Sequence, residues 1–477
     1  MATLPATPNE PRFSYLQSMR LGTFHIGSSF ADILGSSIWN YVMANGMMAL
    51  GGFVATPVTL LLAMRQLLVP LTIFTGHLSD THPIWGYHRL PYIWIGRGLM
   101  LISLPLLPLA TTLILGGNSL GWALAFLAFV MYGIGTQTSG SPFIALVRDS
   151  APKAKQGLAY AIVQTMLVAA FAFSPLIYAR LAQAFLPNYE NNRSSLAQYN
   201  LDLFWLATAV AMGISLIAWI VSVVGIEKPN HTLAAAQQAS SAAATNNSAN
   251  NLAQFKSVLR SILGDRRMRS FFMLLAIGAM SGFGQDGVLE PSLREVFGYS
   301  FSQSAITTGF WGIGLLVGLI GCIGLTRKWA TVEQTKIALL GLILSSFGMA
   351  WMAFATFSQN ESMVIPSVTA FGLGFGIYTA GASPLLMVMA LDNRAGVYLG
   401  LWSMAQLLAR GIGIALGGII YDLTRAAGFA PSAAYGIVFT LEAIGFLVCI
   451  YFLQASDVRS FARESNVPAT AALEAID

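Results

Sequence analysis

Apolar runs of about 20 residues recur along the chain from Leu21 to Leu453, and short polar segments separate them. A run of this length can cross the hydrocarbon core of a bilayer as a helix, which pairs its own backbone donors and acceptors. The runs do not alternate polar and apolar residues as the strands of a membrane barrel do. The pattern therefore predicts an all-α membrane protein with twelve transmembrane helices, near residues 22–47, 54–76, 92–115, 120–146, 157–185, 201–225, 270–292, 303–325, 335–357, 364–390, 397–420 and 433–454.

The longest polar interruption, residues 227–269, divides this pattern into a six-helix N-terminal half, 1–226, and a six-helix C-terminal half, 270–477. It contains a tract rich in Ala, Ser, Asn and Gln, which cannot bury a core and predicts a flexible cytoplasmic linker. The segment SVLRSILGDRRMRS follows the tract and is basic and amphipathic. It either lies along the membrane surface or simply anchors the next helix by its charge.

The two halves carry the same short pattern at the same place. A Ser-Pro pair at 141–142 is followed by Asp149 and then by a Gly-Leu pair, and a Ser-Pro pair at 383–384 is followed by Asp392 and another Gly-Leu pair. Two six-helix pseudo-repeats joined by a long central loop are the layout of the major facilitator class. The repeat therefore predicts the major facilitator fold.

The loop after the second predicted helix supports this class, because it reads GHLSD from Gly76 to Asp80 and then reaches Arg89. Major facilitators carry a Gly-x-x-x-Asp motif with a basic cluster at this position. Gly76 lets two helices approach closely, and Asp80 can cap a helix or pair with Arg89. With Asp149 and Asp392 these residues form a predicted cytoplasmic gate. An ordinary polar turn is the alternative.

Composition and charge agree with a membrane protein. Of the 477 residues 55% are hydrophobic and 9% are charged, whereas soluble domains carry roughly a quarter charged residues. The net charge of +5 lies in short loops, so we expect no nucleic-acid partner. Basic residues gather in the loops on the side of the N-terminus, among them Arg20, Arg89, Arg97 and Arg148, and the opposite side holds only Arg193, Arg294 and Arg425. The positive-inside rule then places both termini in the cytoplasm.

The sequence offers no evidence for an enzyme or a metal site. The two cysteines, Cys322 and Cys449, both lie in apolar runs and predict neither a disulfide framework nor a zinc site. We also find no nucleophile–base set and no cofactor-binding loop. We therefore expect a protein that is not an enzyme and has no bound metal.

Charged residues inside membrane helices are costly and usually functional. Asp286 and Glu290 are four residues apart, so they should share one helix face, and Pro291 should weaken the helix there. Two such carboxylates repel unless a cation, a proton or hydrogen-bond donors lie between them. The pair predicts a substrate or proton site, or else a structural pair neutralised by Arg65 or Arg410.

Further polar residues fall inside other predicted helices. Asp32 and Asn40 form a similar polar face two turns long in the first helix. We therefore predict one polar cavity lined by Asp286, Glu290, Asp32, Asn40, Gln285, Arg65 and Arg410. His25 could ligate the metal of a pigment through a neutral imidazole nitrogen, although a single helix histidine more often bonds to a neighbour.

Two motifs, one in each half, resemble the PucC/LhaA-like (bacterio)chlorophyll delivery family, a branch of the major facilitators. The first is GHLSDTH followed by RLPYIWIG at residues 89–96, and the second is GQDGVLEP at 284–291 followed by VFG. The similarity extends from about Leu21 to Leu453. One departure lies in the first helix, where the family pattern has a basic and an acidic residue beside the asparagine, and this chain has Tyr41 and Asn45 beside Asn40.

The resemblance implies that the protein delivers or handles chlorophyll or bacteriochlorophyll during assembly of light-harvesting or photosystem complexes. The implied partners are the lipid bilayer, the pigment, light-harvesting or photosystem proteins and pigment-synthesis enzymes. The implied location is the inner or photosynthetic membrane (thylakoid or intracytoplasmic). Two alternatives stay open: a proton-coupled secondary transporter of a small solute, and a permanent structural subunit of a pigment–protein complex.

Overall fold

The computed structural model describes residues 13–152, 155–186, 196–227, 260, 264–326, 333–389 and 395–458. The first group of helices is α1 (Tyr15–Ile33), η1 (Leu34–Ile38), α2 (Trp39–Ala49), α3 (Ala55–Leu67), α4 (Leu71–Thr81), α5 (Leu90–Ser103), α6 (Leu106–Leu115), α7 (Leu120–Asp149), α8 (Gln156–Phe185) and α9 (Leu196–Val223). The second group is α12 (Arg266–Phe283), η4 (Gly284–Gly287), α13 (Leu289–Glu295), α14 (Phe301–Thr326), α15 (Gln334–Ser358), η6 (Glu361–Met363), α16 (Val364–Met389), α17 (Ala395–Ala426) and α18 (Pro431–Ala455).

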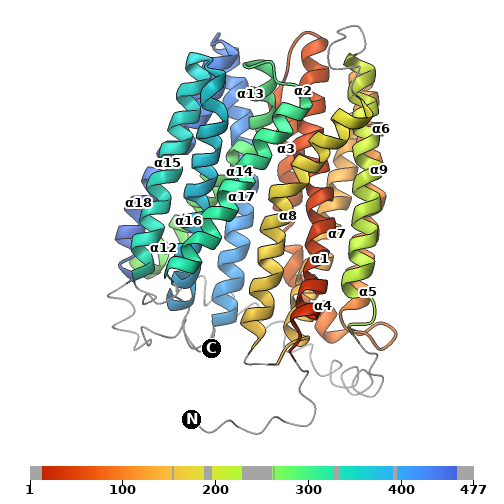
Figure 1. Ribbon diagram of the computed structural model, residues 1–477, viewed down its shortest axis with the longest axis vertical. Helices are drawn as coiled ribbons and strands as arrows, with labels where there is room; N and C mark the ends of the chain where they lie inside the picture. The colour runs from red at the N-terminus through yellow and green to blue at the C-terminus, as the bar shows by residue number, and fades with distance from the viewer. Residues whose placement is uncertain are drawn as a thin grey trace.

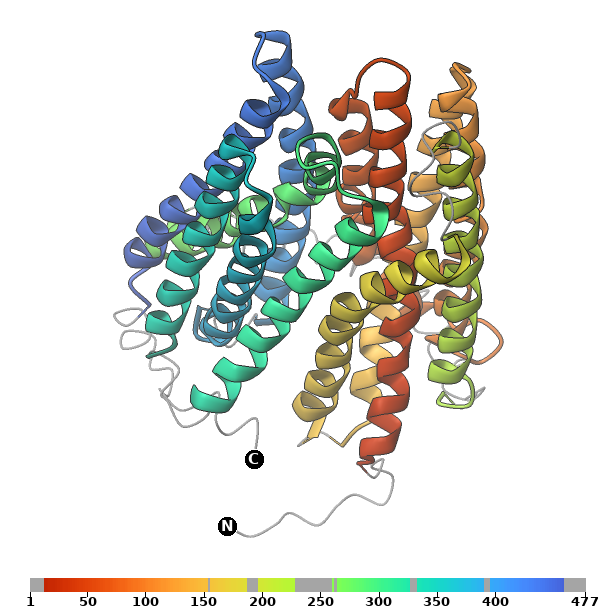
Figure 2. The same cartoon turned by 45° about the horizontal axis from the view of Figure 1, so that its top comes forward.

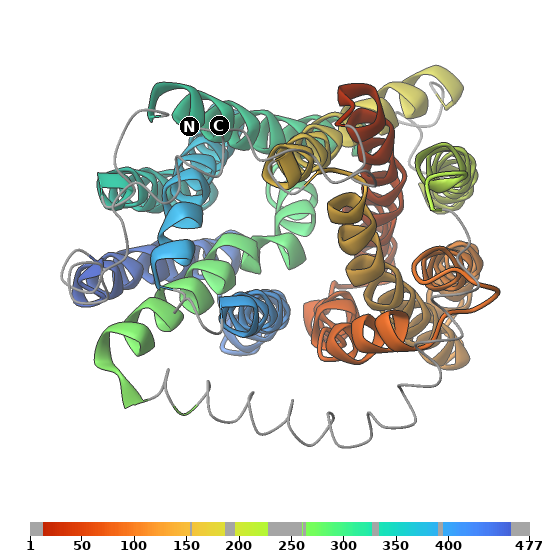
Figure 3. The same ribbon diagram turned by 90° about the horizontal axis from the view of Figure 1, so that it is seen from below.

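The two groups of helices lie side by side, with their long axes along the same direction (Figure 1). Helix α1 begins and helix α18 ends at the same end of the molecule. Seen from that end, α8 packs on α14 and α3 packs on α17 (Figure 3), and α13 also packs on α2. The boundary between the groups is therefore formed by helices from both.

Ten helical segments in the described part of the chain are long and apolar enough to cross a membrane. They confirm an all-α, multi-pass membrane protein. Two more helical segments, 15–49 and 55–81, are not among the ten. They run beside the others in Figure 1 and carry the polar residues Asp32 and Arg65. The count of twelve stays a prediction, as do the limits of the two halves, since most of 227–269 lies outside the described residues.

Glycine lets helices within the second group pack at backbone distance. A Cβ atom at Gly314 would lie 2.5 Å from the carbonyl oxygen of Thr369, and one at Gly341 would overlap the backbone of Tyr378. Without a hydrophobic driving force between helices in lipid, close approach at small residues supplies the packing energy. This explains why α16 can pack tightly against both α14 and α15.

The first long helix contains a π-helical turn. η1 covers Leu34–Ile38 and joins α1 to α2 without a break in the helical path. The hydroxyl of Ser36 donates to the carbonyl oxygen of Asp32 at 2.6 Å, so it binds a backbone acceptor inside the helix. Such turns often occur at functional sites, and this one lies beside the central cavity described below.

The helix that carries Asp286 and Glu290 is interrupted, which corrects one prediction. α12 ends at Phe283, a 3₁₀ turn covers Gly284–Gly287, and α13 begins at Leu289, so the two acids do not share the face of one continuous helix. Pro291 lies in the first turn of α13, where proline is tolerated because backbone N–H groups are unpaired there anyway. The interruption therefore coincides with the glycines, which disfavour helix, and precedes the proline.

Candidate functional site

A cavity of about 220 Å³ lies between the two groups of helices. From the first group it is lined by residues of α1, η1, α3 and α8, and from the second by residues of α12, η4, α13, α14 and α17. Five of the seven residues predicted to line one polar cavity do so: Gln285, Asp286, Glu290, Arg65 and Arg410. Its apolar wall includes Phe171, Phe283, Leu289, Trp311 and Leu315.

The carboxyl group of Glu290 accepts hydrogen bonds from donors in both groups of helices. Ser37 donates to its Oε1 at 2.5 Å and Thr308 to the same oxygen at 3.2 Å. The amide of Asn40 donates to its Oε2 at 3.5 Å and to the carbonyl oxygen of Gly287 at 3.1 Å. Glu290 is only 4% exposed, so it is held by neutral donors and not by the arginine that one sequence interpretation suggested.

Asp286 has a cationic partner. Its Oδ2 lies 2.9 Å from Nη2 of Arg410, and its Oδ1 accepts from the amide of Gln285 at 2.9 Å. The guanidinium of Arg410 also stacks over the ring of Phe283, 4.0 Å from the centroid. Of the two arginines considered from the sequence, Arg410 is therefore the counter-charge of Asp286.

A second ion pair belongs to the first group. Nη1 of Arg65 lies 3.1 Å from Oδ1 of Asp32, and that oxygen also accepts from the hydroxyl of Tyr132 at 2.6 Å. The carbonyl oxygen of Arg65 accepts from Gln137 at 3.2 Å. Each group of helices thus contributes one arginine–aspartate pair beside the cavity, and both of these arginines line it. Tyr132 and Gln137 were not predicted, because an uncharged residue on another helix gives no sequence signal.

Asp32 and Asn40 are not among the residues that line the cavity. They lie behind it and act through neighbours, Asp32 by holding Arg65 and Asn40 by bonding to Glu290. His25 is not among the lining residues either. Its ring lies edge-on to Phe24 and Phe143, at centroid distances of 5.7 and 5.3 Å. Its role as a pigment ligand stays a prediction.

Arg97 corrects a second prediction, because it does not lie in a loop on the side of the N-terminus. It is in α5, 3% exposed, with its guanidinium 4.0 Å from the ring centroid of Phe24 and 4.8 Å from that of Trp219. Its Nη1 donates to the hydroxyl of Ser28 at 3.1 Å. Aromatic faces and one hydroxyl therefore hold this cation inside the first group.

The predicted gate residues Asp80, Arg89 and Asp149 come together at the ends of α4, α5 and α7. Arg89 forms an ion pair with Asp80, donates to Ser79 Oγ at 2.8 Å, and lies 3.7 Å from Oδ2 of Asp149 through its Nε. A Cβ at Gly76 would lie 2.7 Å from Ser141 Oγ, as expected for close helix approach.

Two parts of the predicted gate need comment: the cap at the start of α5, and Asp392. The cap on the start of α5 is Glu227, which accepts from the backbone N–H of His88 at 2.6 Å and of Leu90 at 2.8 Å, while Asp80 serves the ion pair. Asp392 lies outside the described residues. The acidic member of the gate from the second group therefore stays a prediction.

The opposite end of the molecule holds contacts that the sequence did not reveal. Asp422 of α17 accepts from the backbone N–H groups of Ala55 and Thr56 at 2.9 and 2.7 Å, so it caps the start of α3 from the other group. Arg294 Nε donates to Asn45 Oδ1 at 2.8 Å. The two groups are therefore joined at this end by several polar contacts.

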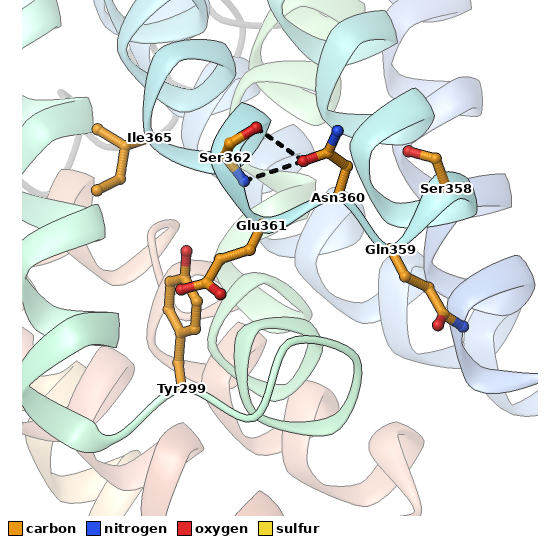
Figure 4. A pocket seen from close by; sticks show the side chains of 7 residues that line it. All are labelled: Tyr299, Ser358, Gln359, Asn360, Glu361, Ser362 and Ile365. Carbon is orange, nitrogen blue, oxygen red and sulfur yellow. Dashed lines mark hydrogen bonds between the residues drawn. The ribbon is translucent and has the colours of Figure 1, made fainter.

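A polar surface pocket of about 710 Å³ lies near the same end, between the segment before α14 and the turn from α15 to α16. Figure 4 shows the side chain of Glu361 beside the ring of Tyr299. Burial, and then the charge of Glu361, raise the pKa of Tyr299 to about 12. The tyrosine is therefore neutral at physiological pH.

Comparison with known proteins identifies relatives across almost the whole chain. The family described as "PUCC protein" matches residues 43–460. An uncharacterized protein in the puhA-bchM intergenic region of Rhodobacter capsulatus is 25% identical, over 90% of this chain and 87% of its own. Protein PucC of Cereibacter sphaeroides is 24% identical (90% and 89% covered), and the bacteriochlorophyll synthase 44.5 kDa chain of Rhodobacter capsulatus is 24% identical (96% and 99% covered).

Solved structures with the same fold include a structure described as "Structural insights into substrate recognition in proton dependent oligopeptide transporters". It superposes with a TM-score of 0.64 at 16% identity, over 95% of this chain and all of that one. At this identity the likeness speaks for the fold alone. The predicted major facilitator fold is thereby confirmed.

Proposed function

Because this chain belongs to the PUCC protein family, we propose that it handles a chlorophyll-type pigment and delivers it during assembly of light-harvesting or photosystem complexes. The pigment is chlorophyll or bacteriochlorophyll. We place this multi-pass membrane protein in the inner or photosynthetic membrane, with both termini in the cytoplasm. Its partners in this proposal are antenna or photosystem proteins and the enzymes that make the pigment, and the protein itself is not an enzyme.

The observation that carries the proposal is the composition of the central cavity. Aromatic and aliphatic side chains, among them Phe171, Phe283 and Trp311, form an apolar wall, and two arginines and two acids also line the cavity. A chlorophyll-type pigment has a large apolar ring system with polar substituents on its edge. The apolar wall fits the ring, and the arginines offer N–H groups to its oxygen atoms.

The size of the cavity indicates that only part of such a pigment would lie inside. Its volume of about 220 Å³ is below the ~300–1,000 Å³ that is usual for ligand pockets. α8 and α14, which line the cavity, pack together at Gly312, where a Cβ would lie 2.6 Å from Ala172 Cα, and spread apart toward the end where α1 begins (Figure 2). We propose that the hydrocarbon tail leaves between these two helices into lipid.

Gentle purification in mild detergent followed by an absorption spectrum tests this function. The wild-type protein should carry pigment when it is produced in a pigment-making host. Leu315→Trp, which fills the cavity, should carry much less, whereas Val317→Trp, on the same helix but 57% exposed, should carry the wild-type amount. A colourless wild-type protein, or equal pigment in both variants, would contradict the proposal.

A second candidate is proton-coupled transport of a small solute. The small volume of the cavity and its ionisable residues Asp286 and Glu290 favour it. Solute uptake driven by a proton gradient in proteoliposomes would support this function over pigment handling. Stable comigration with an antenna complex, without uptake or pigment release, would instead support a permanent structural subunit.

A further inference from the structure

One buried carboxyl group behind the cavity has no partner. Glu442 of α18 is 7% exposed, and neither of its side-chain oxygens has a hydrogen-bond partner among the described residues. It is not among the residues that line the cavity. An ionised carboxylate without donors is far less stable in such a place than the neutral acid. The group is therefore stable there only when it carries a proton.

The carboxyl group packs directly against the interruption between α12 and α13. A Cβ atom at Gly284, the first residue of η4, would lie 2.6 Å from Oε1 of Glu442 and 3.4 Å from the carbonyl oxygen of Gly413 in α17. Helices α17 and α18 and the turn η4 thus meet at this point. A side chain at this position would displace the carboxyl group from its present place.

Arg410, the cation of α17 that lies beside η4, is already paired. Asp286 lies two residues after Gly284, and Arg410, three residues before Gly413, donates to it. Arg410 therefore neutralises Asp286 and is not an ion-pair partner of Glu442 in this arrangement. The same turn separates an ion pair on its cavity side from an unpaired acid on its other side.

Other charged or titratable groups on the surrounding elements offer no compensation. In α13, Glu290 and Glu295 are acids, and the cation Arg294 donates to Asn45 Oδ1 at 2.8 Å. In α17, the other charged residues are Asp422, which caps α3, and Arg425 in the last turn. The other titratable residues of α18 are Tyr435, Cys449 and Tyr451. The charged residues of α12 and α15 lie in their first turns: Arg266, Arg267, Arg269 and Lys336.

We propose that Glu442 is a proton-binding site whose occupancy depends on the packing of η4 against α18. While Gly284 packs over the carboxyl group of Glu442, the group stays protonated. A movement of η4 that admits water breaks the O–H bond, the proton passes to water, and a carboxylate is left. By linkage, binding of the proton favours the packed position of the turn that carries Asp286. The inference is independent of the cargo of the protein.

Infrared difference spectroscopy of the purified full chain in lipid vesicles at neutral pH tests the protonation state. The wild type should show the carbonyl stretch of a carboxylic acid that accepts no hydrogen bond. Glu442→Gln should remove that band, and Glu290→Gln should leave it in place. If Glu442→Gln removes carboxylate stretches instead, Glu442 is ionised and the proposal is wrong.

The coupling to η4 is tested separately. Gly284→Ala forces a methyl group against Glu442 Oε1 and should shift or abolish the acid band, whereas Gly321→Ala, at a position with open space around it, should not. Transfer of the wild-type protein to heavy water gives a test without a substitution. The acid band of Glu442 should shift more slowly than the bands of exposed groups, because Gly284 shields the carboxyl group from water. An unchanged band in a folded Gly284→Ala protein, or immediate exchange in the wild type, would overturn the coupling.

Discussion

The guanidinium of Arg410 donates to the carboxylate of Asp286 at 2.9 Å and thereby joins α17 to the 3₁₀ turn η4. Both residues line the cavity between the two groups of helices. The position of η4 is therefore tied to a charged contact that a ligand in the cavity can reach.

Replacing Asp286 by Ala should abolish activity and leave membrane insertion intact. The change leaves Arg410 as a largely buried cation without its partner, which should cost about 3 kcal/mol of unfolding free energy. The double variant Asp286→Ala, Arg410→Ala should recover part of that stability, because neither charge is then left alone. Denaturation in detergent and assembly of pigment–protein complexes in cells measure the two effects. Normal assembly in the single variant would show that the proposed site is wrong.

Glu290→Ala should also abolish activity, because Ser37 and Thr308 lose their shared acceptor inside the protein. Ser37 then loses its acceptor, which should cost about 1–3 kcal/mol, whereas Thr308 can still donate to the carbonyl oxygen of Ser304 at 3.3 Å. Glu290→Gln keeps one acceptor oxygen and should fold like the wild type, so it separates loss of charge from loss of structure. Equal stability of the Ala and Gln variants would mean that these hydrogen bonds do not hold the cavity together.

Asp422→Ala should weaken the closure of the end opposite the start of α1. It removes the cap that α17 provides to α3, which should cost about 1 kcal/mol. A cysteine placed at Ser37 should then react faster with a membrane-impermeant thiol reagent added from that side. Asp422→Asn keeps one acceptor and should show an intermediate rate. Unchanged labelling in Asp422→Ala would argue against a role for this cap in closure.

Arg89→Ala should reduce pigment-complex assembly, because one guanidinium contacts Asp80, Ser79 and Asp149. Arg89→Lys should restore only part of the activity, since an ammonium group cannot reproduce the planar fork. Arg148→Ala is the matched control: it also lies close to Asp149, at 3.5 Å, but its side chain is 61% exposed. Equal losses in Arg89→Ala and Arg148→Ala would indicate a general charge effect and not a gate.

A reporter fused after Asp477 should be active in the cytoplasm, as the positive-inside rule predicts. An even number of membrane helices returns the chain to the side on which it starts. A fusion in the segment after α9 should also report from the cytoplasm, whereas one in the loop between α17 and α18 should report from the opposite side. A signal from the far side of the membrane for the reporter after Asp477 would overturn the count of twelve.

The sequence located the main features of the cavity because charges inside apolar runs are rare and costly. That argument identified Asp32, Arg65, Asp286, Glu290 and Arg410 as separate residues. It could not pair them, because each pair joins two helices whose relative rotation is a property of the packed fold. Arg97 was misplaced for a related reason: an arginine near the end of an apolar run looks the same whether it faces water or aromatic rings.

Other features gave no signal at all. Glu227 and Asp422 are acids near helix ends, and the helices that they cap are far from them in sequence. The 3₁₀ turn at Gly284–Gly287 was predicted as helix because apolar residues flank it on both sides.

The π-helical turn at Leu34–Ile38 sets the rotation of everything that follows it in the same helical segment. A regular helix advances by about 100° per residue. Removing one residue from this turn would therefore turn α2 by roughly that angle and swing Asn40 away from Glu290, and Tyr41 away from the carbonyl oxygen of Tyr299 that it bonds at 3.3 Å. The extra residue in this turn thus changes the rotation of the helix. As a result, Asp32 before the turn faces Arg65, and Asn40 after it faces the second group of helices.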